Sequence, residues 1–508
     1  MPAAATGTTV PAPATPTPAP VVQASPTAVA GKPVEVPVTV TPDPDALYSG
    51  VRGCRPPDQW QAGPDSIGDP FYPQLGNSGY DTFHYTIDLS ADLDSGVITA
   101  TTTIQAKATQ DLRSFNLDLQ GLNIAAITVN GASARYNHTG SELTVTPATA
   151  LKSGDQFTVV VSYSGVPGAV RMEGDPVTMG WNRYAGGVYV ASEPAGAHNW
   201  YPVNDHPCDK ATYTFIVTVP QPYVVAANGT LVGTKDNGTT TTYVWEAHDP
   251  MASYLATINI GDFERFEQPG PDGLLIRNYF PRALVGRLAG EFEPTARMIE
   301  YFNSIFGPFP FEAYGVVVVD ADLGYALETQ TLSLFGLGIE NSSGDASEVV
   351  AHELAHQWFG DSISLKTWKD IWLNEGFATY AQLLWLEHTR GRAALHEQVQ
   401  QMYSYITRGN YPPPGDPPPD DLFNPSVYLR GGLTLHALRL QVGDDAFFRI
   451  LRTYADRFKY GNANTQDFIA VAEEVSGKDL SAFFDAWLYR QALPPLPGVP
   501  SLPEGRLP

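Results

Sequence analysis

Two patterns of hydrophobic and polar residues divide the chain. Over about 80–262, apolar and polar residues alternate in short runs rich in Val, Ile, Thr and Tyr, such as FHYTIDLSADL, GVITATTTIQAKA, FTVVVSY and TYTFIVTVP. Alternation with a period of two is typical of strands with one buried face. We therefore predict an antiparallel β domain. Asn-Gly pairs, which favour hairpin turns, occur at Asn130-Gly131, Asn228-Gly229 and Asn237-Gly238.

Beyond Pro271 the apolar residues recur with helical spacing. The pattern is clearest in LVGRLAGEFEPTARMIEYFNSIF, SEVVAHELAHQWF and NEGFATYAQLLWLEHT. Between these segments, AYGVVVVDADL is typical of a strand. The second domain is therefore predicted to be mainly helical with a small sheet.

The two ends of the chain differ from both domains. The first 50 residues contain 11 Pro and only four charged residues, a composition that favours extended chain over a packed core. We expect a Pro/Ala/Thr-rich disordered tether at 1–65, a β domain at 66–265, a catalytic domain at 266–490 and a Pro-rich tail at 491–508. A stalk of this kind favours an exported or cell-surface protein, although a cytoplasmic linker would have the same composition.

Charge and cysteine content narrow the classes of function. Asp and Glu outnumber Lys and Arg by 54 to 30, for a net charge of −24, which disfavours nucleic acid and anionic membranes as partners. We expect neither a membrane-spanning segment nor an export signal in the sequence as given, because it contains no run of 18 or more apolar residues and does not begin with a basic stretch followed by an apolar one. With Cys54 and Cys208 alone, it can build neither a disulfide-dense scaffold nor a four-cysteine zinc site. The sequence does not decide whether these two cysteines form a disulfide bond with each other.

The segment His352-Glu353-Leu354-Ala355-His356 carries the first sign of chemistry. Residues four apart lie on one face of an α-helix, so both imidazoles can reach one metal ion while Glu353 lies beside them. The pattern predicts half of a Zn²⁺ site with its own general base. The alternative is a surface helix with incidental histidines. Apolar flanking residues argue against it, because two histidines in a buried helix need partners.

Catalytic zinc takes three protein ligands and keeps one position open, so a third ligand is needed. Glu375 follows His356 by 19 residues, within WLNEGFA at the start of the next predicted helix. Antiparallel packing of the two helices would bring its carboxylate to the metal. The alternative is a first-turn Glu that complements the helix dipole. Its position, its apolar surroundings and the preceding half-site favour one Zn²⁺ per chain, bound by His352, His356 and Glu375.

HELAHQWFGD followed by WLNEGFATY resembles the M1 family of zinc aminopeptidases, gluzincins with an HExxH-x18-E signature. GYALE at 324–328, VYLRGG at 427–432 and SEPAGAHNWYPVNDHPCDKATYTFIVTVP are similar to three further stretches of that family. The resemblance covers about 80–493. It implies a saddle-like antiparallel β domain followed by a thermolysin-like, mainly helical α+β catalytic domain, in a short form without the family's large C-terminal helical domain.

The resemblance also implies residue roles in the hydrolysis of the amino-terminal residue of peptides by metal-activated water. Glu353 would move a proton from that water to the leaving amine. Tyr428 would donate its phenolic O–H to the oxyanion. Glu328, and Glu193 from the β domain, would bind the α-ammonium group of peptides with a free amino terminus.

Two departures from the family pattern bear on amino-end recognition. Ala191 stands where the family usually has Gln, and Thr329 replaces an Asn. A thermolysin-like zinc endopeptidase would use the same ligands, ignore the amino end and cleave N-acetylated peptides at internal bonds. A secreted binding protein with a non-catalytic zinc site is the third alternative. It is disfavoured because a structural site normally closes with a fourth protein ligand, and no Cys or His stands out for that role.

Overall fold

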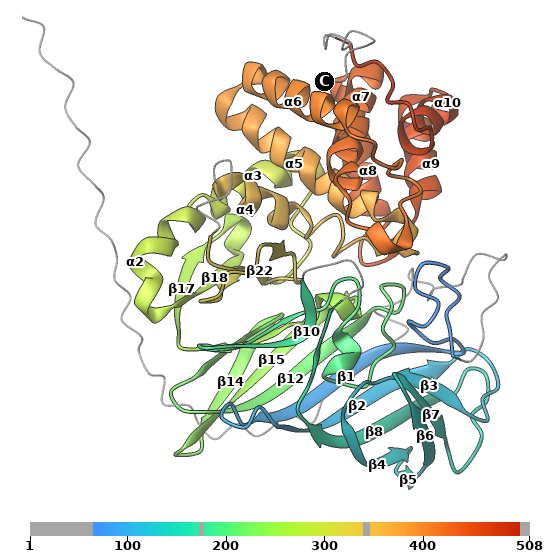
Figure 1. The fold of residues 1–508 in the computed structure, drawn as a ribbon, viewed down its shortest axis with the longest axis vertical. Coiled ribbons are helices and arrows are strands. Elements are labelled where there is room, and N and C mark those ends of the chain that lie inside the picture. Colours follow the sequence, from blue (N-terminus) through green and yellow to red (C-terminus); the bar gives the residue numbers. More distant parts are fainter. Residues whose placement is uncertain (1–64, 172–176, 339–345, 498–508) are drawn as a thin grey trace, which may run out of the picture.

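The computed structural model describes residues 65–171, 177–338 and 346–497. Most of the predicted tether and part of the predicted tail lie outside this range. Cys208 is disulfide-bonded, and Cys54, whose pairing with Cys208 the sequence left open, lies outside the described residues. Figure 1 shows a strand-rich N-terminal part below a mainly helical C-terminal part. This order confirms the predicted fold class.

The largest sheet has eight strands in the described part of the chain, in the order β14-β15-β12-β1-β2-β8-β4-β5. Its neighbouring strands are antiparallel except for the β1–β12 pair, which is parallel. Buried positions alternate along β2 and β8 as the period-two pattern predicts. The strands are β1 Tyr80–Ala91, β2 Ile98–Ala108, β4 Asn123–Val129, β5 Ala132–Ser133, β8 Gln156–Gly165, β12 Ala211–Pro220, β14 Thr230–Asp236 and β15 Thr240–Met251.

Two smaller sheets complete the N-terminal part. One has the order β13-β16-β11-β10-β9 and the other β3-β7-β6. Their strands are β3 Phe115–Asp118, β6 Arg135–Thr139, β7 Glu142–Thr146, β9 Ala169–Arg171, β10 Thr178–Tyr184, β11 Gly187–Ala191, β13 Val224–Ala227 and β16 Ile258–Gly261. Glu193 lies in the loop that follows β11, close to acidic residues of the C-terminal part.

The Asn-Gly predictions have two outcomes. The first pair joins β4 to β5, with φ of 50° at Asn130 and 78° at Gly131, as type I′ hairpin turns require. The pair at 237–238 likewise lies between the paired strands β14 and β15. The hairpin prediction for the pair at 228–229 is wrong, because β13 and β14 belong to different sheets. Asn228 is instead buried, and its side chain binds backbone groups of other segments.

A mixed sheet begins the C-terminal part, in the order β17-β18-β20-β22-β21, with β19 beside β18. Its presence confirms the strand predicted within AYGVVVVDADL. The strands are β17 Phe263–Pro269, β18 Leu275–Pro281, β19 Ala313–Tyr314, β20 Val316–Val318, β21 Ala326–Leu327 and β22 Ser333–Phe335, and a separate small pair is β23 Ser364–Leu365 and β24 Asn462–Ala463.

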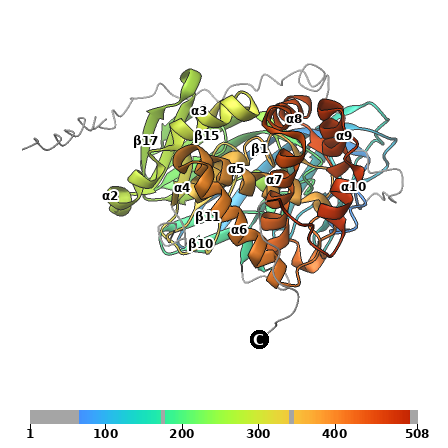
Figure 2. The ribbon, with the colours of Figure 1, turned by 90° about the horizontal axis from the view of Figure 1, so that it is seen from above.

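Among the α-helices of the described C-terminal part, α5 contacts α4, α6 and α7 (Figure 2). The helices of this part are α2 Val285–Leu288, α3 Thr295–Phe306, α4 Ala346–Ala355, α5 Trp372–Arg390, α6 Arg392–Arg408, α7 Gly431–Val442, α8 Asp444–Arg457, α9 Thr465–Ser476 and α10 Ser481–Phe484. Within the described residues, none of the helices has the length and apolar character needed to cross a bilayer.

Residues 284–306, whose apolar residues recur with helical spacing, do not form one continuous helix. They form the short α2, a 3₁₀ turn at 289–292 and then α3 from Thr295. Pro294 stands immediately before α3. Proline lacks the N–H that would continue a helix, and its ring clashes with the preceding turn, so the helical pattern restarts there.

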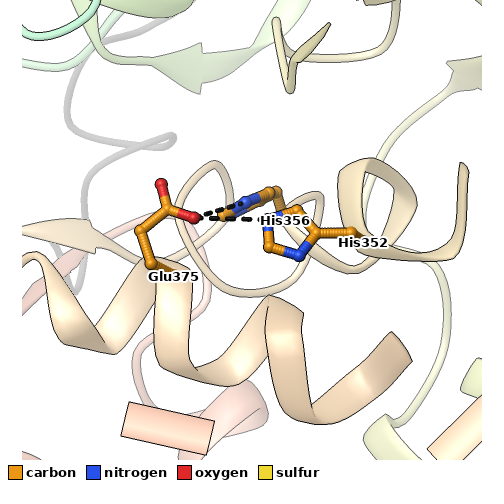
Figure 3. Close-up of side chains that lie close together, drawn as sticks. All are labelled: His352, His356 and Glu375. Carbon is orange, nitrogen blue, oxygen red and sulfur yellow. Dashed lines mark hydrogen bonds and ion pairs between the residues drawn. The ribbon is translucent and has the colours of Figure 1, made fainter. Parts of the chain in front are cut away.

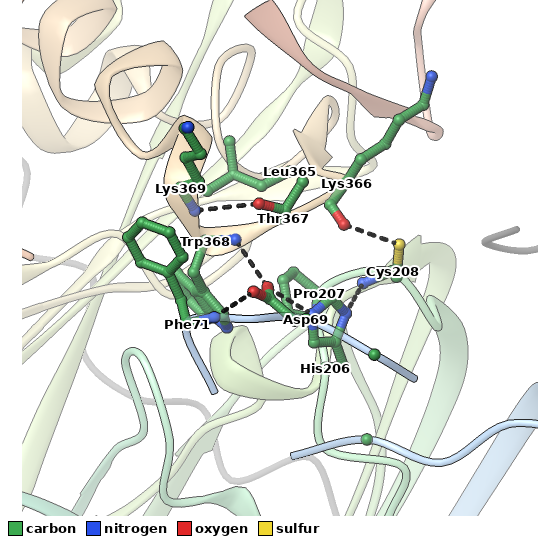
Figure 4. Close-up of polar contacts among 12 residues, drawn as sticks. Asp69, Phe71, His206, Pro207, Cys208, Leu365, Lys366, Thr367, Trp368 and Lys369 are labelled. Carbon is green, nitrogen blue, oxygen red and sulfur yellow. Dashed lines mark hydrogen bonds and ion pairs between the residues drawn. The ribbon is translucent and has the colours of Figure 1, made fainter. Parts of the chain in front are cut away.

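Asp69 joins the two parts of the molecule (Figure 4). Its fully buried carboxylate accepts hydrogen bonds from the backbone N–H of Trp368 at 3.0 Å and of Phe71 at 2.8 Å. It also accepts from His206 Nε2 at 3.1 Å, while His206 Nδ1 accepts from the N–H of Cys208. Burial raises the pKa of Asp69, but the hydrogen bonds outweigh it and leave the pKa below its ordinary value. The charged carboxylate therefore stabilises the contact between the parts.

Replacing Asp69 with Asn is expected to lower the free energy of unfolding by about 2–4 kcal/mol near neutral pH, because an amide N–H would face other donors in a buried site. Because folding lowers the pKa of Asp69, its contribution is complete above the unfolded pKa of about 3.9 and is lost as pH falls through the folded pKa. Urea unfolding at several pH values measures this. The exposed Asp65 is the control, and equal midpoints for Asp65→Asn and Asp69→Asn would contradict the prediction.

Candidate active site

The three predicted zinc ligands lie together (Figure 3). One ligand atom from each of His352, His356 and Glu375 lies within 4.8 Å of the other two. Glu375 Oε2 is 3.2 Å from His352 Nε2 and 3.5 Å from His356 Nε2. The two imidazoles come from the end of α4 and the carboxylate from the first turn of α5.

Helix geometry accounts for this convergence. The last residue of α4 is Ala355, yet the N–H of His356 still donates to the carbonyl of His352 at 3.3 Å, so the two histidines share a face. Gly376, the next residue of α5, packs against Gly431 of α7 so closely that a Cβ on Gly376 would lie 2.9 Å from the backbone of Gly431. These glycines let the two helices meet backbone to backbone.

The donor set fits zinc. His356 Nδ1 lies 3.0 Å from the carbonyl oxygen of Phe359, to which it donates, so the neutral imidazole that binds a metal would direct its Nε2 lone pair at the site. Burial opposes ionisation of Glu375, but the two imidazoles lower its pKa to about 2. Two imidazole nitrogens and one charged carboxylate form a His₂Glu set, which is typical of catalytic zinc sites with an open position.

Three further carboxylates surround the ligand set. Glu193, Glu328 and Glu353 expose 6%, 2% and 6% of their surface. Burial, together with the charges of neighbouring carboxylates, raises the pKa of all three. Within the described residues, Oε1 of Glu193 and Oε1 of Glu328 lack a hydrogen-bond partner. Unpartnered buried carboxylates are costly, so this site is built to receive positively charged groups.

The three carboxylates reach the site from three different segments of the chain. Glu193 follows β11 of the N-terminal part, and Glu328 follows β21 at the edge of the mixed sheet. Glu328 Oε1 lies 4.0 Å from His356 Nδ1. Glu353 lies in α4 beside His352, and an oxygen of Glu353 falls within 4.8 Å of ligand atoms of Glu328 and His356.

Tyr428 lies in a short π-helical segment, Ser426–Arg430, which leads into α7. Its ring stacks near that of His352, with centroids 6.3 Å apart. Burial and the nearby carboxylates raise its pKa well above the ordinary value, so the phenol keeps its proton. Arg430 anchors the segment, because its buried guanidinium donates to the carbonyls of Trp487 and Gln491 at 2.8 and 3.1 Å.

A cavity of about 480 Å³ opens beside His352 and Tyr428. Its wall comes from α5, α6 and the segment before Tyr428. Glu193, Glu328 and Glu353 are not among the residues that line it. Among the lining residues are the apolar Leu383, Met402, Phe423 and Pro425 and the amides Gln382 and Gln398.

All seven residues predicted for the site therefore meet in one place. Sequence reasoning missed Gln357, whose buried amide binds the segment that carries Glu328. It also missed the anchoring role of Arg430. Gln357 directly follows His356, but its hydrogen-bond partners lie far from it in the sequence. No local sequence pattern therefore indicated its role.

Two family models match the chain. The Peptidase M1 N-terminal domain matches residues 81–255 and the Peptidase family M1 domain matches residues 291–487. Aminopeptidase M1-A of rice (Oryza sativa subsp. japonica) is 25% identical over 456 residues, which cover 81% of this chain and 50% of the relative. Aminopeptidase N of Streptomyces lividans is 25% identical and covers 80% and 50%. The chain thus spans about half the length of these curated relatives.

Solved structures match over a larger share of their length. A mutant M1 zinc metallopeptidase from Deinococcus radiodurans, bound to a Tyr-Ser-Ala substrate, is 32% identical with a TM-score of 0.79. The match covers 85% of this chain and 99% of that one. A two-domain M1 zinc metallopeptidase mutant bound to L-arginine is also 32% identical, with a TM-score of 0.78, 85% coverage of this chain and 99% of the other.

Proposed function

Because the chain belongs to the M1 family of zinc metallopeptidases, we propose that it is an aminopeptidase that removes the amino-terminal residue from peptides. The observation that carries this proposal is the pair of buried carboxylates, Glu193 and Glu328, beside the zinc-ligand set. Their unpartnered oxygens can accept hydrogen bonds from an α-ammonium group, which would offset their burial. A peptide with a free amino terminus supplies that group next to its first peptide bond.

Each group of residues in the site would have its own role in the reaction. Zinc, when bound by His352, His356 and Glu375, supplies a Lewis acid that polarises a carbonyl group and activates water. The carboxylate of Glu353 accepts a proton from the attacking water and returns it to the nitrogen of the leaving amine. The Tyr428 hydroxyl donates a hydrogen bond to the oxygen that gains negative charge as the carbonyl carbon becomes tetrahedral.

We assign the cavity beside His352 and Tyr428 to the substrate residue that follows the scissile bond. Neither Glu193 nor Glu328 lines this cavity, so it stays free when the two glutamates hold the amino terminus. The side chain after that bond would then enter the cavity lined by Leu383 and Met402. Apolar walls and a volume of about 480 Å³ suit a large apolar side chain at that position.

Replacing Glu328 with Ala is expected to lower kcat/KM for free-amine substrates by about 10- to 100-fold, because one charge-assisted contact to the ammonium group is lost. Zinc content should not change, since Glu328 is not one of the three ligands. A panel of amino-acid p-nitroanilides and metal analysis measure both quantities. Asp322→Ala is the matched control, because Asp322 is an exposed carboxylate six residues before Glu328. Equal kinetics for both variants would remove Glu328 from amine binding.

An N-acetylated peptide tests the function itself. An aminopeptidase that anchors the ammonium group should hydrolyse free-amine substrates and leave the acetylated peptide intact. Cleavage of the acetylated peptide at an internal bond, at a rate similar to that of the free peptide, would indicate an endopeptidase. Zinc binding without hydrolysis of either peptide would indicate a non-catalytic zinc site.

A further inference from the structure

A tight turn directly follows Glu328. The N–H of Leu332 donates to the carbonyl of Thr329 at 2.9 Å, which closes a four-residue turn. Thr331, at the third position, has φ of 67°. Turns with a positive φ at this position usually have Gly or Asn there, because a β-branched side chain is strained in the left-handed region. Such strain persists only where surrounding contacts hold the residue in place, and it is concentrated at functional sites.

Three buried contacts hold Thr331, each through a different group. Its N–H donates to Oε1 of Gln357 at 2.8 Å. Its Oγ1 accepts from the backbone N–H of Gly229 at 2.8 Å. Its carbonyl accepts from Nη1 of Arg277 at 2.8 Å. The partners come from the residue after the zinc-binding His356, from the β13–β14 connection and from β18.

Gln357 and Asn228, the residue before Gly229, hold the backbone next to Thr331. Nε2 of Gln357 donates to the carbonyl of Glu328 at 2.9 Å. Nδ2 of Asn228 donates to the carbonyl of Gln330 at 2.7 Å and to that of Leu255 at 2.9 Å. Side chains of both the N-terminal and the C-terminal part therefore hydrogen-bond to the backbone at this turn.

The β13–β14 connection is specialised for this contact. Gly229 has φ of 77°, and a Cβ there would lie 1.9 Å from the carbonyl oxygen of Glu246, so no larger residue fits. Arg277 is completely buried and donates to the carbonyls of Ala227 and Gly229 as well as to Thr331. Burial lowers the pKa of Arg277 to about 10, so the guanidinium stays charged near neutral pH and makes strong hydrogen bonds.

The carboxylate of Glu328, by contrast, has an oxygen that accepts no hydrogen bond from the residues that the structure describes. Its position depends on the backbone that carries it. We propose that Asn228, Gly229, Arg277, Thr331 and Gln357, here called the Thr331 clamp, are positioning residues that fix the Glu328 carboxylate where the substrate's α-ammonium group binds. The proposal rests on the amine-binding role of Glu328 proposed above. It assigns the β13–β14 connection of the N-terminal part a role in amino-end recognition.

The hydroxyl of Thr331 offers a sharp test in the full-length zinc enzyme. Besides the N–H of Gly229, Nη2 of Arg277 donates to the Thr331 hydroxyl oxygen at 3.2 Å. Thr331→Val keeps the shape but removes this acceptor, whereas Thr331→Ser keeps it. The Val variant should lose about tenfold in kcat/KM for free-amine p-nitroanilides, mainly through a higher KM, with unchanged zinc content. The Ser variant should stay within about twofold of the parent. Parent-like kinetics of the Val variant would overturn the proposal.

A double-mutant cycle with Glu328→Ala separates positioning from a general structural effect. If the clamp acts through Glu328, Thr331→Val should change kcat/KM less than about twofold in the Glu328→Ala background. Additive losses would overturn the clamp while leaving the amine-binding role of Glu328 intact. If Glu328→Ala alone changes nothing, the amine-binding role is wrong and the clamp proposal falls with it.

A second variant keeps the test decisive if Thr331→Val does not fold. Thr331→Gly adopts a positive φ without strain and also lacks the hydroxyl. It should therefore fold, bind zinc and show the same loss in kcat/KM and the same non-additivity with Glu328→Ala. A folded Thr331→Gly enzyme with parent kinetics would show that the clamp does not position Glu328.

Discussion

Replacing Glu353 with Gln is expected to lower kcat by about 10³- to 10⁴-fold while zinc stays bound. Glutamine keeps the size of the side chain but has no basic oxygen, so it can neither accept a proton from water nor return one to the leaving amine. Glu353 is outside the His352, His356 and Glu375 ligand set, so metal content should not fall. Steady-state kinetics together with metal analysis of the same preparation measure both outcomes.

The control for Glu353→Gln is Glu300→Gln, the same chemical change at an exposed position of α3. It should leave both kcat and zinc content unaltered. KM of the Glu353→Gln enzyme should change far less than kcat, since the proton transfer occurs in the transition state and contributes little to substrate binding. A variant with full turnover would remove Glu353 from the mechanism, and a variant without zinc would make it a metal-positioning residue.

The zinc-ligand set was predictable from the sequence because its geometry is largely local. An i, i+4 pair of histidines lies on one helix face regardless of the rest of the fold. Glu375 required one further assumption, that its helix packs against the first. The close approach of Gly376 and Gly431 shows how α5 is held, but that contact joins residues 55 positions apart and has no local signature.

The residues that hold Glu328 could not be predicted, because each acts across a long separation in sequence. Asn228 and Gln330 are 102 residues apart, as are Gly229 and Thr331. The Asn-Gly pair is a true turn signal, but turn propensity is local and does not reveal that the strands on either side enter different sheets. Likewise, the apolar periodicity across 284–306 concealed the break before Thr295, although Pro294 was the signal. Glu193 was placed only through the family resemblance.

Removing the metal is expected to abolish activity, with a loss of about 10⁴-fold or more, because polarisation of the carbonyl and activation of water both disappear. It should also lower the thermal midpoint. The metal binds the folded state, and without it Glu193, Glu328, Glu353 and Glu375 crowd one buried site with less compensating charge. Chelation followed by kinetics, metal analysis and thermal unfolding measures the three effects.

Substitution of a ligand distinguishes loss of the metal from side effects of the chelator. His356→Ala should show low zinc content and no turnover, and added zinc should not restore it, whereas zinc should restore the chelated parent enzyme. His396→Ala is the matched control, since His396 is an exposed histidine of α6, and it should retain both zinc and activity. Because two side chains rarely hold zinc in a catalytic site, full activity of His356→Ala with one zinc bound would contradict the assignment of the ligand set itself.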